Sequence, residues 1–209
     1  EDARDELFME RVISSIKKNI VDLEIVAPLP APTEQSRQGV LCIADSHFGK
    51  EFKIYDLHDH IINEYSPEIF YERMSVLLGR VRDVIQKEGL EELHVYNLGD
   101  SVDGFLRNSQ IWSLRYGVVD SAIIFGNYMG DWLKALSHIV PITYSQTDGN
   151  HDELRLLDGK KGQHLNDSAG NIILNCIELK NENNPNLKVI KNRTGMIYDN
   201  VCGYGVLGF

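Results

Sequence analysis

The sequence predicts an α/β fold built on parallel strands, and three observations support this prediction. Apolar runs of strand length at residues 40–44, 93–98 and 139–144 each lead into a polar, chemically reactive segment. Amphipathic helical patterns separate consecutive runs, which gives the order strand, helix, strand, helix, strand. Units of this kind form parallel strands with right-handed crossovers, and ligands collect at the carboxyl ends of the strands.

The N-terminal part of the chain is predicted to be separate from this unit. An approximate helical stripe covers residues 4–20, and three prolines within residues 28–32 end any helix. We therefore divide the chain into an N-terminal helix with a proline-containing linker, residues 1–38, and a domain over residues 39–209.

The first unit of the domain begins with the continuous apolar run Val40–Ala44, which predicts a buried strand. Residues 52–62 mix polar and aromatic side chains, so we expect an irregular excursion or a hairpin there. Ser66 and Pro67 then provide an N-cap and a proline at the first helical position. The apolar spacing that follows predicts an amphipathic helix that ends near Gly89.

Two further helices are predicted over residues 118–136 and 167–179, on the same spacing argument. Beyond them, a strand-like stretch at residues 188–192 precedes two short β runs. These runs, residues 196–198 and 201–209, are expected to pair antiparallel through a turn at Asp199-Asn200.

The composition is that of an ordinary globular domain, with 43% hydrophobic and 25% charged residues among 209. No apolar run approaches the roughly 18 to 20 residues that a membrane span needs, and no signal peptide is evident. We therefore expect a cytoplasmic location and no membrane partner. A net charge of −10 argues against a basic surface over the whole protein, although not against a local basic rim for nucleic acid. Three scattered cysteines are interpreted as reduced core or strand residues.

Three short segments at the predicted strand ends carry the chemistry. They are Asp45-Ser46-His47, Gly99 to Asp103, and Gly149-Asn150-His151-Asp152. Alone, the first segment is a tripeptide that occurs by chance in many proteins, and the second and third are common turn sequences. All three in order, one crossover apart, instead predict a shared site, and its carboxylate, imidazole and amide groups suit Mn²⁺, Fe²⁺ or Zn²⁺.

These segments resemble the calcineurin-like metallophosphoesterase superfamily, whose pattern runs D-x-H, G-D-x-x-D, G-N-H-D/E, a lone His and then G-H-x-H. The first three motifs are intact, and the resemblance covers about residues 39–209. It implies a layered fold in which helices flank a central β-sandwich, with the C-terminal part missing from this chain.

The resemblance also implies a centre of two divalent metal ions, with Mn²⁺ expected and Fe²⁺ or Zn²⁺ as alternatives. Asp45 and His47 are the implied ligands of the first ion. Asp100 is implied to bridge both ions, and Asn150 to bind the second through its amide oxygen.

The remaining motif residues are implied to act around the ions. His151 is expected beside the substrate, where it protonates the leaving oxygen or stabilises the transition state. Asp152 is expected to orient His151, and Asp103 to support the site from behind the metal ligands.

The lone His and G-H-x-H do not occur after Asp152. The chain also starts without methionine and stops in an apolar stretch, so we expect a fragment whose active site is incomplete. His164 is the only later histidine, and we interpret it as a substrate-side or surface residue. The other histidines are expected in a solvated loop (His58, His60) or in structural positions (His94, His138).

Candidate substrate-binding residues are basic groups near the motifs, namely Arg107, Arg115, Arg155 and His164. Arginines bind phosphates, and Trp112, which lies between the first two, is equally suited to stacking on a base or to simple packing.

The resemblance implies hydrolysis of phosphodiester bonds by attack of a metal-bridging hydroxide, and we expect a DNA nuclease. Gly104 follows Asp103 where protein phosphatases of the superfamily usually have Arg-Gly, and Asp152 ends the third motif where they have Glu. A general resemblance to phage and prophage phosphoesterases also points to DNA. The alternatives are a phosphatase or nucleotide phosphodiesterase with a small substrate, or an inactive metal-stabilised binding scaffold. The oligomeric state is left open.

Overall fold

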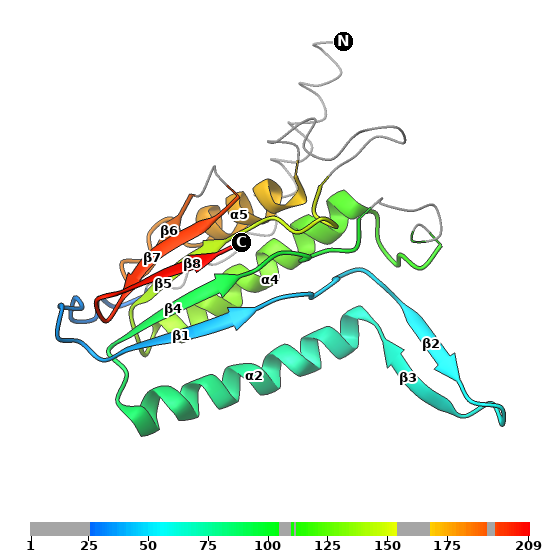
Figure 1. Ribbon diagram of the computed structural model, residues 1–209, viewed down its shortest axis with the longest axis horizontal. Coiled ribbons are helices and arrows are strands. Elements are labelled where there is room, and N and C mark those ends of the chain that lie inside the picture. Colours follow the sequence, from blue (N-terminus) through cyan, green and yellow to red (C-terminus); the bar gives the residue numbers. More distant parts are fainter. Residues whose placement is uncertain (1–25, 105–109, 111, 154–167, 192–194) are drawn as a thin grey trace, which may run out of the picture.

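A four-stranded parallel sheet forms the centre of the protein (Figure 1). The computed structural model describes residues 26–104, 110, 112–153, 168–191 and 195–209. The strand order is β1-β4-β5-β6, and the strands are β1 (Gln38–Ile43), β4 (Glu92–Asn97), β5 (Ile142–Gln146) and β6 (Leu187–Ile190).

Three helices connect these strands and share one apolar core with them: α2 (Pro67–Glu88), α4 (Val118–Ser137) and α5 (Ala169–Lys180). The four strands have the same order in the sheet as along the chain. Right-handed crossovers between them therefore place every connecting helix on the same face of the sheet. The fold is therefore α/β, as predicted. The described residues contain this sheet and two hairpins, and the β-sandwich implied by the resemblance remains a prediction.

The predicted start and end of α2 are confirmed. The Ser66 hydroxyl accepts a hydrogen bond from the backbone N–H of Ile69 at 3.4 Å, and Pro67 occupies the first turn. Gly89 ends the helix with a φ of 62°, a left-handed conformation that favours glycine. The Trp132 indole N–H of α4 donates to the Met74 carbonyl of α2 at 3.0 Å, which links the two helices through the core.

The predicted third strand is displaced by several residues. We expected it over 139–144, but β5 begins at Ile142. The backbone N–H groups of Ile139 and Val140 still donate to the carbonyl of Leu136 at 2.9 and 3.2 Å, so these apolar residues close the end of α4. Apolar character alone does not distinguish this helix end from a strand.

The sheet has two chemically different faces. On β4, Leu93 and Val95 belong to the helix-covered core, whereas the alternating His94 and Tyr96 point to the other face. A hairpin of β7 (Ile197–Val201) and β8 (Tyr204–Gly208) reaches that second face.

Asp199 of this hairpin contacts both His94 and Tyr96. Its Oδ2 atom lies 2.7 Å from His94 Nδ1 and accepts from the Tyr96 hydroxyl at 2.9 Å. The predicted turn at Asp199-Asn200 is therefore wrong. The turn lies at Cys202 and Gly203, which both have positive φ, so Cys202 is neither a core nor a strand residue.

The excursion after β1 is a hairpin, formed by β2 (Phe52–Tyr55) and β3 (Ile61–Tyr65), that projects from the body of the protein (Figure 1). His58 and His60 lie in its exposed turn, as expected for a solvated loop. Its exposed side chains include several large apolar ones: Ile54, Tyr55, Leu57, Ile61 and Ile62.

The helix predicted for residues 4–20 lies outside the described residues. The predicted linker packs closely on the domain, since the Asn186 amide donates to the Ala27 carbonyl at 2.8 Å and accepts from the Leu29 N–H at 2.8 Å. In the described part of the chain, every helix is too short or too polar to cross a lipid bilayer.

Candidate metal centre

The loops that follow β1, β4 and β5 meet at the carboxyl edge of the sheet. Main-chain hydrogen bonds continue past the end of β1: the Asp45 N–H donates to the Gly99 carbonyl at 3.2 Å, and the His47 N–H donates to the Asp100 carbonyl at 2.9 Å. The two motif segments are therefore held side by side by their backbones before any side chain interacts.

Three of the predicted metal ligands have an unusual backbone conformation. Asp45, His47 and Asp100 have φ values of 52°, 42° and 51°, in the left-handed region. A non-glycine residue in this region costs about 1 to 3 kcal/mol, and such residues occur often at functional sites. The hydrogen bonds between the loops stabilise this conformation, which turns the side chains of these three residues toward one another.

Two glycines allow the second and third loops to touch. A Cβ atom at Gly99 would lie 2.5 Å from the backbone nitrogen of Gly149, and Gly99 itself has a φ of 90°. A Cβ atom at Gly149 would collide with the backbone nitrogen of Asp100. Any larger side chain at either position would push the loops apart.

The structure brings one residue from each motif into a single cluster. His47, Asp100 and His151 each offer one ligand atom, and these atoms lie within 4.8 Å of one another. The rings of His47 and His151 meet edge to face with centroids 4.6 Å apart. The Asp100 carboxylate also accepts a hydrogen bond from the His151 backbone N–H at 2.9 Å.

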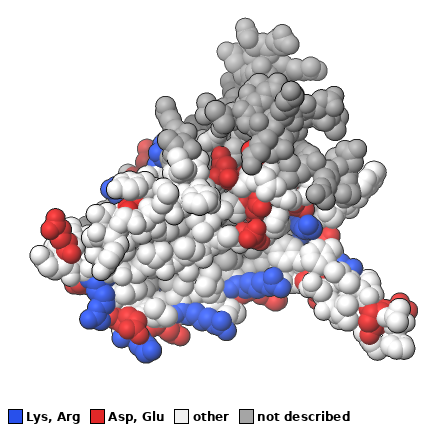
Figure 2. All heavy atoms as spheres, in the orientation of Figure 1, with Lys and Arg blue, Asp and Glu red and all other residues white. Residues whose placement is uncertain are grey.

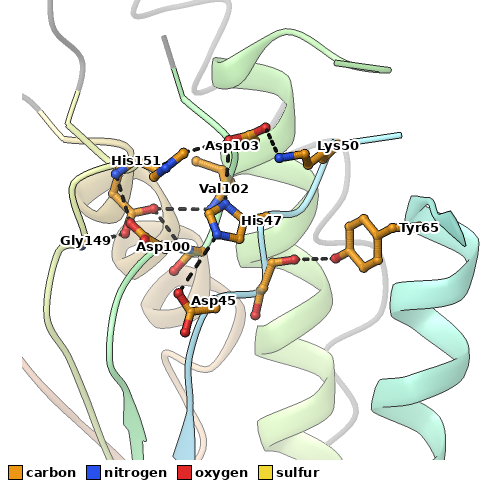
Figure 3. Close-up of polar contacts among 12 residues, drawn as sticks. Asp45, His47, Lys50, Tyr65, Asp100, Val102, Asp103, Gly149 and His151 are labelled. Atoms are coloured by element: carbon orange, nitrogen blue, oxygen red, sulfur yellow. Dashed lines mark hydrogen bonds and ion pairs between the residues drawn. The ribbon is translucent and has the colours of Figure 1, made fainter. Parts of the chain in front are cut away.

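The other two predicted ligands lie beside this cluster. Asp45 Oδ1 is 3.9 Å from His47 Nε2, and its side chain is exposed (Figure 3). Asn150 has an exposed side chain and lies in the turn between Gly149 and His151. Two imidazoles and a carboxylate suit a divalent ion such as Mn²⁺, Fe²⁺ or Zn²⁺, so the cluster could hold a metal ion.

Asp103 is the centre of the charged network behind this cluster (Figure 3). It is fully buried, and its Oδ1 atom lies 2.7 Å from His151 Nδ1 and accepts from the Gln110 amide at 2.9 Å. Lys50 Nζ lies 3.3 Å from Oδ2. Burial raises the pKa of Asp103, but His47, Lys50 and His151 outweigh it and lower that pKa to about 2. Asp103 is therefore ionised at neutral pH.

His47 also faces this carboxylate. Its Nδ1 atom is buried, lacks a hydrogen-bond partner, and lies 3.6 Å from Asp103 Oδ1, which is too far for a hydrogen bond. The Asp103 carboxylate still raises the pKa of His47, against the effect of burial.

The expected role of Asp152 is wrong. Its carboxylate accepts hydrogen bonds from the backbone N–H groups of Ser101, Val102 and Gly149 at 3.0, 3.2 and 2.9 Å. Both carboxylate oxygens are therefore used to fasten the second loop to the third. The carboxylate that orients the His151 imidazole is Asp103, from the second motif.

Among the predicted substrate-binding residues, Arg107, Arg155 and His164 lie outside the described residues. Arg115 is described, and its guanidinium forms ion pairs with Glu51 at 3.5 Å and Glu68 at 3.2 Å. Trp112 is 90% exposed, so the packing alternative for this side chain is wrong.

Sequence reasoning missed three residues of the site. Lys50 and Gln110 contact Asp103, and the Tyr65 hydroxyl donates a hydrogen bond to the Ser46 carbonyl, between two predicted ligands. The position of Lys50, three residues after His47, was a usable signal for a basic group near the site. Tyr65 and Gln110 gave no such signal, because their contacts depend on how the loops fold back.

No family model matches the chain. A search of curated proteins finds similarity to YonJ, an uncharacterized protein derived from the SPbeta prophage of Bacillus subtilis (strain 168). The two are 36% identical over 195 residues, which are 89% of this chain and 45% of YonJ. The chain thus spans less than half the length of this relative.

Proposed function

We propose that this chain forms the metal-binding part of a metal-dependent phosphodiesterase that acts on DNA. One observation carries the proposal: the side chains of His47 and Asp100, two predicted ligands, and of His151, the predicted acid, come from three separate strand-end motifs and lie within 4.8 Å of one another. Strand-end loops of an α/β sheet are the usual place for such a site, and these residue types suit a hydrolytic metal.

The proposed centre takes two divalent ions, with Mn²⁺ as the expected metal. Asp45 and His47 would hold one ion, Asp100 would be shared, and Asn150 would contribute to the second. Bound ions of this kind supply charge stabilisation for the phosphate and an activated water molecule.

His151 has the position of a proton donor in the proposed reaction. The Asp103 carboxylate, 2.7 Å from Nδ1, fixes the ring and favours a proton on that nitrogen. The other ring nitrogen, Nε2, is then directed to the substrate, where the doubly protonated ring donates its Nε2 proton to the leaving oxygen and returns to the neutral form that keeps the Nδ1 proton. Lys50, whose side chain is partly exposed, provides positive charge at the same place for an anionic substrate.

The prophage origin of YonJ supports a DNA substrate, and the surface charge indicates how DNA would be bound. On the face shown in Figure 2, basic and acidic side chains lie close together along the edge formed by α2, and most of the centre is uncharged. Among the described residues, this face shows no continuous basic track. We therefore expect binding to depend on the proposed metal centre and on local cations such as Lys50.

The test is a comparison of Asp100→Asn with the unaltered protein, using the full-length protein loaded with Mn²⁺. Hydrolysis of single-stranded DNA, double-stranded DNA and bis-p-nitrophenyl phosphate is measured together with metal content. Because Asp100 contributes charge to the whole cluster, we expect metal content and turnover to fall together, turnover by at least about 10²-fold.

Asp59→Asn is the matched control. Asp59 also has a left-handed backbone, with a φ of 61°, but lies in the exposed turn of the β2–β3 hairpin. This variant should keep both metal and activity. An unaltered protein that binds Mn²⁺ but cleaves none of the three substrates would contradict the proposed activity, and one that binds no divalent metal would contradict the site itself.

A further inference from the structure

The peptide around Ser46 determines where two predicted metal ligands point. Ser46 lies between Asp45 and His47, and both neighbours have the left-handed backbone conformation. A small rotation of this peptide would move both side chains at once. A group that hydrogen-bonds to the Ser46 carbonyl therefore influences the geometry of the candidate metal centre.

The turn is held from two sides. On the sheet side, the N–H groups of Asp45 and His47 donate to carbonyls of the loop after β4, at 3.2 and 2.9 Å. On the other side, the Tyr65 hydroxyl donates to the Ser46 carbonyl (Figure 3). Tyr65 ends β3, so this contact joins the projecting β2–β3 hairpin to the ligands.

Tyr65 is itself well supported. Its ring stacks on that of Phe52, with centroids 6.2 Å apart and an interplanar angle of 28°. The guanidinium of Arg73, from α2, lies 5.7 Å from the ring centroid. Burial raises the pKa of Tyr65 to about 12, against the opposing effect of Arg73, so the hydroxyl stays protonated and remains a donor.

We infer that Tyr65 is a positioning residue for the metal centre, which sets the orientation of Asp45 and His47 through the Ser46 carbonyl. The inference rests on the proposed metal site. Residues that orient metal ligands through a hydrogen bond typically change metal affinity by 10- to 100-fold when they are altered. Tyr65 acts one step further back, on the peptide that carries the ligands.

Tyr65→Phe tests this inference because it removes only the hydroxyl and keeps the ring that packs on Phe52 and Arg73. The full-length protein is titrated with Mn²⁺ by calorimetry, and the visible spectrum of the Co²⁺-loaded form is recorded as a measure of ligand geometry. We expect Mn²⁺ affinity to fall by about 10-fold, the lower end of that range, and the Co²⁺ spectrum to change.

Tyr128→Phe is the matched control. Tyr128 has a partly buried ring that packs on Phe70 and Tyr71 in the core. This variant should bind Mn²⁺ as the unaltered protein does, and thermal unfolding should show that both variants remain folded.

The outcomes separate this inference from the function on which it rests. Equal Mn²⁺ affinity and an unchanged Co²⁺ spectrum in Tyr65→Phe would overturn the positioning role and leave the metal site standing. Failure of the unaltered protein to bind Mn²⁺ would overturn both. A loss of affinity of the same size in Tyr128→Phe would show that any lost core hydroxyl has this effect, and would also overturn the positioning role.

Discussion

Asp103 and Asp152 are both fully buried carboxylates at the same edge of the sheet, but their surroundings differ in kind. Asp103 is surrounded by the side chains of His151, Gln110 and Lys50. Asp152 accepts hydrogen bonds from the backbone N–H groups of the second and third loops.

This difference appears in their acidity. Burial raises the pKa of both groups. At Asp103 the nearby imidazoles and ammonium reverse the effect and lower the pKa to about 2. At Asp152 the hydrogen bonds from the backbone N–H groups of Gly149 and Val102 reduce the effect of burial without reversing it. The pKa of Asp152 is therefore raised to about 6. The comparison indicates that Asp103 acts on the side chains of the site, whereas Asp152 fastens its loops together.

The largest expected effect is on the imidazole that Asp103 holds. His151→Ala should lower turnover of the full-length protein by roughly 10²- to 10⁴-fold, the usual contribution of a general acid, and leave metal content nearly unchanged. Steady-state kinetics and metal analysis of the same preparation check this prediction.

His58→Ala, in the exposed turn of the β2–β3 hairpin, is the control and should change neither quantity. Loss of metal in His151→Ala would identify His151 as a ligand, which its place in the cluster with His47 and Asp100 also allows. The role assigned to Asp103 would then be to orient a ligand rather than an acid.

The second effect is on stability. Asp152→Ala removes the acceptor of three backbone N–H groups and should lower the free energy of unfolding by about 2 to 5 kcal/mol. Chemical denaturation measures this free energy. The control is Asp83→Ala on the exposed face of α2, whose free energy of unfolding should lie within about 0.5 kcal/mol of that of the unaltered protein. A loss of activity in Asp152→Ala without any loss of stability would contradict the architectural role.

The smallest expected effect is on the pH dependence of stability, and it involves a second carboxylate that is paired with a histidine. Asp199 also lies 2.7 Å from a histidine Nδ1 atom, that of His94, but it does so on the polar face of the sheet. Burial raises the pKa of Asp199, and hydrogen bonds from His94, the Asn200 N–H and Tyr96 outweigh it, so the pKa is lowered. Its contribution to stability is therefore present above the unfolded-state pKa of about 3.9 and is lost as the pH falls through the lower folded value.

We expect the stability difference between the unaltered protein and Asp199→Asn to shrink as the pH falls from about 5 toward 3. Denaturation curves across this range measure that difference. A difference that stays constant with pH would show that the hairpin does not depend on the charge of Asp199.

Much of this architecture could be predicted from local sequence patterns. The apolar runs and capping residues predicted β1, β4 and α2, because hydrophobic period and backbone preference act over a few residues. The placement of Asp45, Asp100 and His151 at one edge followed from the parallel order of the strands.

What could not be predicted depends on contacts between distant segments. Asp103 and Asp152 occupy similar places after their strands, and only the way the two loops cross decides which carboxylate faces His151. The hydrogen bond from Tyr65 to Ser46 likewise depends on a hairpin folding back on its own base. Sequence periodicity contains no information about such crossings.

The backbone hydrogen bonds between the first two motif loops also set the distance between these loops. Parallel strands repeat about every 4.8 Å, and the hydrogen bonds from Asp45 to Gly99 and from His47 to Asp100 carry this register beyond the strand ends. Adjacent ligand loops therefore stand at about the repeat distance of the sheet itself. Two ions in a hydrolytic centre typically lie about 3.5 to 4 Å apart, slightly less than this repeat. The spacing of the sheet would thus limit how far apart two metal ligands on these adjacent loops can lie.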